Sequence, residues 1–203
     1  MISEYENAKT ELLMARNPSC RKFFEKNKDF LELGYFYFLN DNLKKAKDCF
    51  DKVLDTDIRA HWAKFLIELI ENNISYYPSY FELRNFLEID LDILIKHFKG
   101  EYVEKIVNYS DFMSSINPEV NKFIGRVFIN NNFKEYGMIY FKRAKNTFYN
   151  DPELHFLLAQ EYDTEGKLDY AINSAETCLK VLPKYYPAEH LLVELKDKLK
   201  NCK

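Results

Sequence analysis

Apolar and polar residues alternate along this chain with the period of an α-helix. The clearest case is residues 187–200, where one side is apolar and the other is rich in lysine and acid. That pattern is typical of a helix with one buried face. The same reasoning predicts further helices near 2–16, 27–39, 43–55, 60–73, 78–88, 89–98, 102–113, 118–131, 134–148, 152–165 and 168–181. We expect an all-α protein, and Asn17-Pro18 is expected to end the first helix.

Two stretches, 118–149 and 152–183, repeat each other with starts 34 residues apart. Each has a small residue, an aromatic or similar residue three positions later, a second small residue after twelve positions and a core residue after sixteen. These positions are Gly125, Phe128, Gly137 and Phe141, then Ala159, Tyr162, Ala171 and Ala175, with an earlier copy in Gly34, Tyr37, Ala46 and Phe50. Antiparallel helices approach closely only where side chains are small, so the two small residues are expected to meet.

Turn-forming residues separate the two helices of each copy. They are Asn40-Asp41-Asn42, Asn130-Asn131-Asn132 and Thr164-Glu165-Gly166. Asn, Asp and Gly tolerate a left-handed backbone or bond to their own backbone, so each copy is predicted to be a helical hairpin.

These spacings resemble the tetratricopeptide repeat (TPR). The copy at 152–183 matches best, through Leu158, Ala159, Tyr162, Gly166, Ala171, Leu179 and the closing Pro183. The resemblance implies a right-handed α-solenoid that forms a single domain over 1–203. Its expected parts are an N-terminal helical segment 1–26, TPR-like repeats 27–58, 118–149 and 152–183, degenerate helical repeats 60–117 and a capping helix 186–203.

The middle segment 60–117 is out of phase with the repeats. Gly34 and Gly125 are 91 residues apart, which is two periods plus 23 residues. We expect a further hairpin here, turned at Lys99-Gly100, but the TPR frame does not place it.

The composition is typical of a globular protein, and the small net charge gives it no strong electrostatic field. Of 203 residues 47% are hydrophobic, and the net charge is −3, so neither nucleic acid nor anionic lipid is an expected partner. No apolar run is long enough for membrane insertion, and the acidic start is unlike a signal peptide. The four cysteines show no metal-ligand spacing and are expected to be thiols in a reducing cytoplasm, with Cys49 and Cys178 buried on second helices.

The sequence offers no constellation for catalysis, a metal or a cofactor. No two of its histidines, His61, His97, His155 and His190, share a helical face. Asp90 and Asp92 are two positions apart, so they point away from each other and are interpreted as cap or solvent residues. We therefore expect a protein that is not an enzyme.

The resemblance implies that the first helix of each hairpin lines a concave groove. The corresponding positions are Leu31, Tyr35 and Phe38, then Lys122, Arg126 and Asn130, then Phe156 and Gln160. Such a groove would hold a segment with a hydrophobic anchor and an acidic group. Two alternatives stay open: the first three residues are core beneath the N-terminal helix or a neighbouring turn, and the Lys122–Arg126 pair is a solvated face.

The function predicted from these features is a cytoplasmic, non-catalytic scaffold or adaptor that binds a peptide or protein segment in the concave groove. The first alternative is a structural subunit that self-associates or builds a larger assembly, because excess Phe and Tyr would form an exposed patch. The second is an accessory module of an enzyme such as a transferase, with any site hidden in 60–117.

Overall fold

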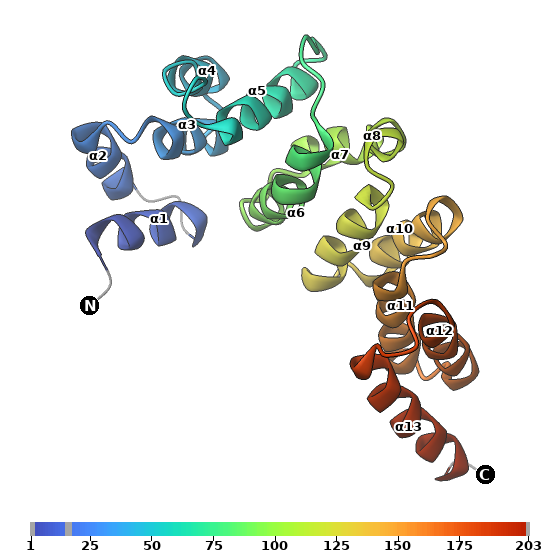
Figure 1. The fold of residues 1–203 in the computed structure, drawn as a ribbon. Helices are drawn as coiled ribbons and strands as arrows, with labels where there is room; N and C mark the ends of the chain where they lie inside the picture. The colour runs from blue at the N-terminus through green and yellow to red at the C-terminus, as the bar shows by residue number, and fades with distance from the viewer. Residues whose placement is uncertain (1–2, 15–17, 202–203) are drawn as a thin grey trace. The chain divides into compact units, whose positions relative to one another are not determined.

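The computed structural model describes residues 3–14 and 18–201, which form thirteen helices and no strand (Figure 1). The first eight helices are α1 Glu4–Met14, α2 Pro18–Asn27, α3 Phe30–Leu39, α4 Leu43–Phe50, α5 Ile58–Ile70, α6 Tyr80–Lys96, α7 Gly100–Asn108 and α8 Ser110–Ile116. The last five are α9 Val120–Asn130, α10 Lys134–Thr147, α11 Pro152–Thr164, α12 Leu168–Val181 and α13 Tyr186–Asn201. The all-α prediction is confirmed.

The chain divides into two compact units. Unit 1 covers Met1–Val120, coloured blue to yellow-green in Figure 1, and unit 2 covers Asn121–Lys203, coloured yellow to red. Successive helices pair closely as α3 with α4 in unit 1 and as α11 with α12 in unit 2, which is a TPR-like arrangement. The single domain over 1–203 and the sense of its superhelix stay predictions.

The small residues of the repeat meet as predicted. A methyl group on Gly125 would lie 3.1 Å from the carbonyl oxygen of Gly137, and one on Gly137 would lie 2.9 Å from the carbonyl oxygen of Gly125. Ala159 and Ala171 are both fully buried in one cluster between α11 and α12. Backbones this close leave no room for larger side chains, so the 34-residue pattern encodes helix contact.

The core position of each hairpin compensates for the small position sixteen residues earlier. A methyl group on Gly125 would lie 2.5 Å from Cδ1 of Phe141, and one on Gly34 would overlap the ring of Phe50. In the third copy the same pair is Ala159 and Ala175, both with no exposed surface. Two copies therefore have glycine at the first position and phenylalanine at the second, whereas the third copy has alanine at both.

The hairpin turns place one residue in the left-handed region seven positions after the first small residue. These residues are Asp41 with φ 62°, Asn132 with φ 65° and Gly166 with φ 70°. Asn, Asp and Gly adopt this backbone at the lowest cost, which explains the turn composition.

Several boundaries differ from the predictions. Pro18 begins an unpredicted helix, α2, because proline suits a first helical turn; residues 15–17 lie outside the described part. The predicted break at Ile89 is wrong, since 80–96 form one helix that begins with a capping box of Ser79 and Glu82. The predicted helix 102–113 is divided at Tyr109, and α4 ends at Phe50.

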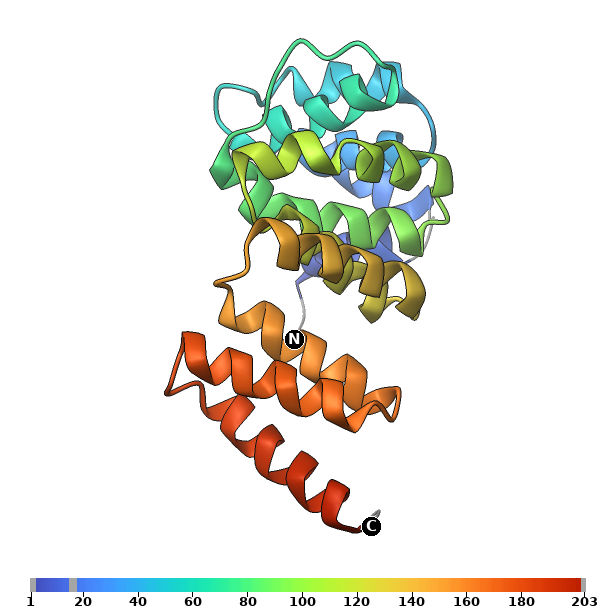
Figure 2. The same cartoon turned by 90° about the vertical axis from the view of Figure 1, so that its right-hand side faces the viewer.

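The C-terminal helix closes unit 2. Figure 2 shows α11, α12 and α13 running side by side in orange and red. Leu195 of α13 joins the buried cluster of Ala159, Ala171 and Ala175, while Lys196, Asp197 and Lys198 are exposed. One apolar and one charged side are expected of a capping helix, and the capping role of α13 stays a prediction.

Candidate binding surfaces

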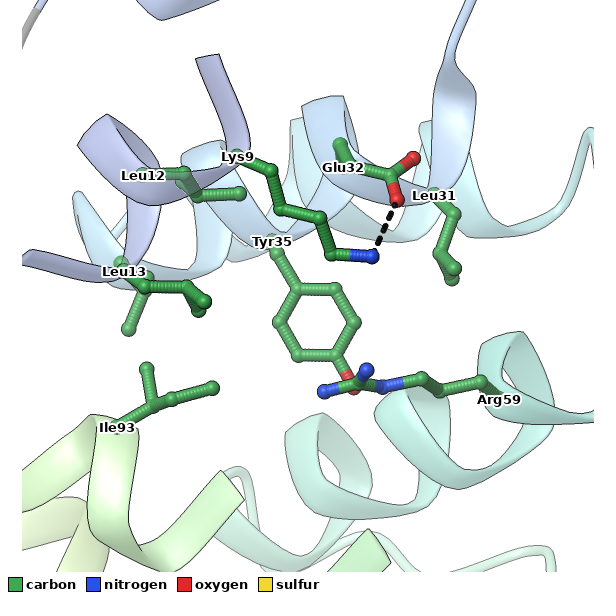
Figure 3. A pocket seen from close by; sticks show the side chains of 9 residues that line it. Lys9, Leu12, Leu13, Leu31, Glu32, Tyr35, Arg59 and Ile93 are labelled. Carbon is green, nitrogen blue, oxygen red and sulfur yellow. Dashed lines mark hydrogen bonds and ion pairs between the residues drawn. The ribbon is translucent and has the colours of Figure 1, made fainter. Parts of the chain in front are cut away.

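A small cavity lies inside unit 1 where α1, α3, α5 and α6 meet (Figure 3). Lys9 and Glu32 approach above the ring of Tyr35, and Arg59 lies at the phenol end of that ring. The volume of about 20 Å³ accommodates about one water molecule and no small-molecule substrate. The lining residues are Lys9, Leu12, Leu13, Leu31, Glu32, Tyr35, Leu39, Arg59 and Ile93.

A buried carboxylate beneath this cavity joins three helices. Asp90 of α6 accepts hydrogen bonds from the Tyr35 hydroxyl of α3 at 2.7 Å and from Trp62 Nε1 of α5 at 2.6 Å. Arg59 donates to the other Asp90 oxygen at 2.8 Å and to the Tyr35 hydroxyl at 3.1 Å. Asp90 is 2% exposed, so its charge is balanced by Arg59 and by the two neutral donors.

The interpretation of Asp90 as a cap or solvent residue is wrong. Leu83, Leu87, Leu91 and Leu94 form the apolar stripe of α6, and Asp90 lies on that stripe one turn after Leu87. The position of a single acid on an apolar stripe was the sequence signal that could have indicated its burial. Burial and then the negative charge of Asp90 raise the pKa of Tyr35 well above its usual range, so the phenol stays a proton donor.

The three groove positions of the first repeat lie in or beside the core of unit 1. Phe38 is 1% exposed and stacks on Tyr102 with ring centroids 5.6 Å apart. Tyr35 is 6% exposed, and Leu31 is half-buried at the cavity. Residues of α1 line the cavity beside Leu31 and Tyr35, whereas Phe38 is covered by Tyr102 of α7, and the role of all three in binding stays a prediction.

The cationic pair of the second repeat is neutralised within unit 2. Lys122 is 2% exposed, and its Nζ lies 2.6 Å from Asp151 and 2.8 Å from Glu153. Arg126 approaches the other Glu153 oxygen at 2.5 Å. Burial raises the pKa of Glu153, but the hydrogen bond and charge of Lys122, together with Arg126, lower it overall. The pair therefore links α9 to the start of α11.

The remaining groove positions of unit 2 reach solvent. Asn130 and Gln160 are exposed on α9 and α11, the first helices of consecutive hairpins. Phe156 of α11 is half-buried, and its ring packs 5.4 Å from that of Tyr185. Two exposed amides and one half-buried aromatic ring thus remain at these positions, and their common face stays a prediction.

Comparison with known proteins adds little to this geometry. No family model and no curated protein matches the chain. A crystal structure described as the APC/C hetero-tetramer Cut9-Hcn1 is similar, with 14% sequence identity and a TM-score of 0.45. The match covers 87% of this chain and 39% of that chain, so this chain spans about two fifths of its length. The TPR-like description rests on the hairpin contacts themselves.

The middle segment contains an open hollow between α5 and α7. It encloses about 400 Å³ and is lined by Leu69, Asn72, Glu101, Glu104, Lys105, Asn108 and Tyr109. Lys105 Nζ donates to the carbonyl oxygen of Ile70 at 2.5 Å and to Asn72 at 3.3 Å. The lysine therefore caps the C-terminal end of α5.

The described ranges 3–14 and 18–201 contain neither a metal-binding cluster nor a membrane-spanning helix. No group of three His, Cys, Asp or Glu side chains there could hold a metal ion. No helix in these ranges has the length and apolar character needed to cross a bilayer. Cys49 and Cys178 are buried thiols as predicted, whereas Cys202 lies outside the described residues.

The stability of unit 2 is expected to decrease in weak acid because of His155. This histidine is buried, and its Nε2 donates to the carbonyl oxygen of Tyr149 at 2.7 Å. Burial lowers its pKa below the usual 6.5, so the unfolded chain takes up the proton first. The stabilising contribution is present above about pH 6.5 and is lost as the pH falls through the folded pKa.

Thermal unfolding followed by circular dichroism between pH 7.5 and 5 measures this loss. His155→Gln, whose amide can still donate to Tyr149, should show a flatter pH dependence than the wild type. Exposed His190→Gln should retain the wild-type profile. Parallel profiles for wild type and His155→Gln would contradict the assignment.

Proposed function

We propose that this chain is a non-catalytic, protein-binding scaffold that holds an extended peptide segment on the first-helix face of unit 2. The observation that carries the proposal is the exposure of Asn130 and Gln160 on consecutive first helices, with the half-buried Phe156 one turn before Gln160 on α11. A cytoplasmic location and a protein partner remain part of this proposal.

The available groups suit a peptide backbone better than an acidic side chain. Each amide offers both a donor and an acceptor, which matches the alternating groups of an extended main chain. Phe156 supplies an apolar contact for one side chain of the peptide. Lys122 is neutralised by Asp151 and Glu153, so an acidic anchor would have only the Arg126 side chain, which is 28% exposed.

Selection of a random-peptide display library on the full chain tests the proposal. An enriched peptide is synthesised, and its Kd is measured by fluorescence anisotropy. Asn130→Ala/Gln160→Ala should weaken binding about tenfold or more, because each lost hydrogen bond contributes about 0.5–1.5 kcal/mol. Asn146→Ala, an exposed asparagine on the second helix α10, is the matched control and should bind like the wild type. Equal affinity for all three proteins would remove this face as the binding surface.

Self-association through unit 1 is the second candidate function. Tyr77 is 62% exposed and Phe81 54%, and the Tyr77 ring lies 5.5 Å from that of Phe112. Exposed aromatic rings of this kind favour association. Light scattering over a concentration series decides the question: a rising mass that Tyr77→Ser/Phe81→Ser abolishes supports assembly, whereas a constant monomer mass opposes it.

A further inference from the structure

We propose that helix α1 occupies a binding groove of unit 1 as an intramolecular ligand, in the place of a partner helix that presents a cation to Glu32. The groove is formed by α3, α5 and α6, and α1 lies across it (Figure 3). This site is separate from the amide face of unit 2 and does not depend on it.

The hold of α1 on the groove is weak. Of its eleven residues only Ala8 and Leu12 are buried, and Ala8 lies beside Cys20 and Phe23 of α2 rather than in the groove. By comparison, α5 buries eight of thirteen residues. A helix of eleven residues is too short to be stable alone in water, so α1 depends on these few contacts. Elements with so little buried apolar surface open at a low free-energy cost.

The groove itself keeps its shape through contacts that do not involve α1. Its floor includes Tyr35, which is tied to Asp90 and Arg59 by the buried polar cluster. Trp62 joins the same carboxylate and is fully buried. Since these bonds link α3, α5 and α6, release of α1 would leave a preformed surface.

The polar contacts of α1 define the chemistry of the partner. The Tyr5 hydroxyl donates to Glu32 Oε1 at 2.5 Å, and Lys9 Nζ lies 3.5 Å from the same oxygen. The Glu32 side chain is 11% exposed, so a partner that replaced α1 would have to supply a cation or donors to it. At the other end of α1, His97 Nε2 bonds to the carbonyl oxygen of Leu13 at 3.1 Å.

The partner segment is therefore an amphipathic helix with a basic residue. Its apolar residues stand at the positions of Leu12 and Leu13, which line the groove. A lysine or arginine precedes the first of them by three positions, as Lys9 precedes Leu12, and a hydroxyl donor lies four positions before the basic residue, as Tyr5 lies before Lys9. Acidic helices are excluded by repulsion from Glu32.

Binding of α1 as a separate peptide tests the proposal. Leu12→Asp in the full chain removes the larger apolar contact and releases the tethered helix. A fluorescein-labelled synthetic peptide of residues 3–14 should bind this variant at least tenfold more tightly than the wild type, where the tethered α1 competes. Val193→Asp, which changes a 62% exposed residue of α13, is the matched control and should behave like the wild type.

A charge exchange tests the role of Glu32. The chain Leu12→Asp/Glu32→Lys should lose the peptide of natural sequence and bind a peptide carrying Lys9→Glu. Hydrogen exchange of the wild type should show faster exchange in α1 than in α5. If Leu12→Asp fails to fold by circular dichroism, Lys9→Glu in the full chain replaces it as the released variant.

Two outcomes would overturn the proposal: no binding of the peptide to a folded released variant, or protection of α1 equal to that of α5. Peptides selected on unit 2 should bind the Leu12→Asp variant as they bind the wild type. Failure of the unit 1 experiment is thus distinguishable from failure of the proposed function.

Discussion

Replacing Asp90 with alanine is expected to lower the free energy of unfolding of unit 1 by about 3–5 kcal/mol. The substitution leaves the Arg59 guanidinium without its 2.8 Å partner and leaves Trp62 Nε1 without an acceptor in a fully buried site. The Tyr35 hydroxyl loses its acceptor as well. Each orphaned buried donor costs about 1–3 kcal/mol, and the unpaired cation costs most.

Urea titration followed by tryptophan fluorescence measures this effect. Trp62 is the only tryptophan in the chain and donates directly to Asp90, so its emission reports on unit 1. Asp92→Ala is the control, because Asp92 forms a surface pair with Lys96 at 2.6 Å and should cost less than about 1 kcal/mol. Equal, small effects of the two substitutions would show that the buried cluster contributes little to stability.

Replacing Gly125 with alanine is expected to destabilise unit 2 by about 1–3 kcal/mol through overpacking. The added methyl group would lie 2.5 Å from Cδ1 of Phe141, whose ring is buried and 1% exposed, and 3.1 Å from the backbone oxygen of Gly137. The ring cannot turn away into solvent, so α9 and α10 must move apart. The higher helix propensity of alanine, up to about 1 kcal/mol, offsets only part of this cost.

A double-mutant cycle identifies the cause. Phe141→Ala alone should cost about 3–5 kcal/mol through the cavity that it creates. Gly125→Ala/Phe141→Ala imitates the Ala159 and Ala175 pair of the third copy. Its cost should be smaller than the sum of the single substitutions by about 1 kcal/mol or more. If the losses of stability in thermal unfolding were additive, steric contact between residues 125 and 141 would not be the cause.

Gly100→Ala is the matched control for this series. A methyl group at Gly100 meets nothing within 4 Å, and the residue begins α7. Alanine there should be neutral or slightly stabilising, because it reduces the conformational entropy of the unfolded chain. A loss of stability like that of Gly125→Ala would show that glycine removal, and not steric contact with Phe141, is the cause.

Local spacing along the chain was sufficient to predict the repeats. Gly125 with Gly137 and Ala159 with Ala171 meet as expected, and the turns reach the left-handed region at Asn132 and Gly166. Contacts within one hairpin join residues that are close in sequence, and their requirements for size and backbone conformation are visible in the residue types. The eight groove positions were implied by the TPR resemblance and stay predictions.

The accessibility of those positions was decided only by tertiary structure. Tyr35 is covered because α1 and Asp90, from helices far along the chain, pack against it, and Lys122 is neutralised by acids at the start of α11. The apolar stripe of α6 indicates that Asp90 faces inward, but its three donors come from α3 and α5 and are not visible in the local sequence. Side-chain type and helical phase determine which face a residue occupies, whereas burial and charge balance depend on which distant helix lies against that face.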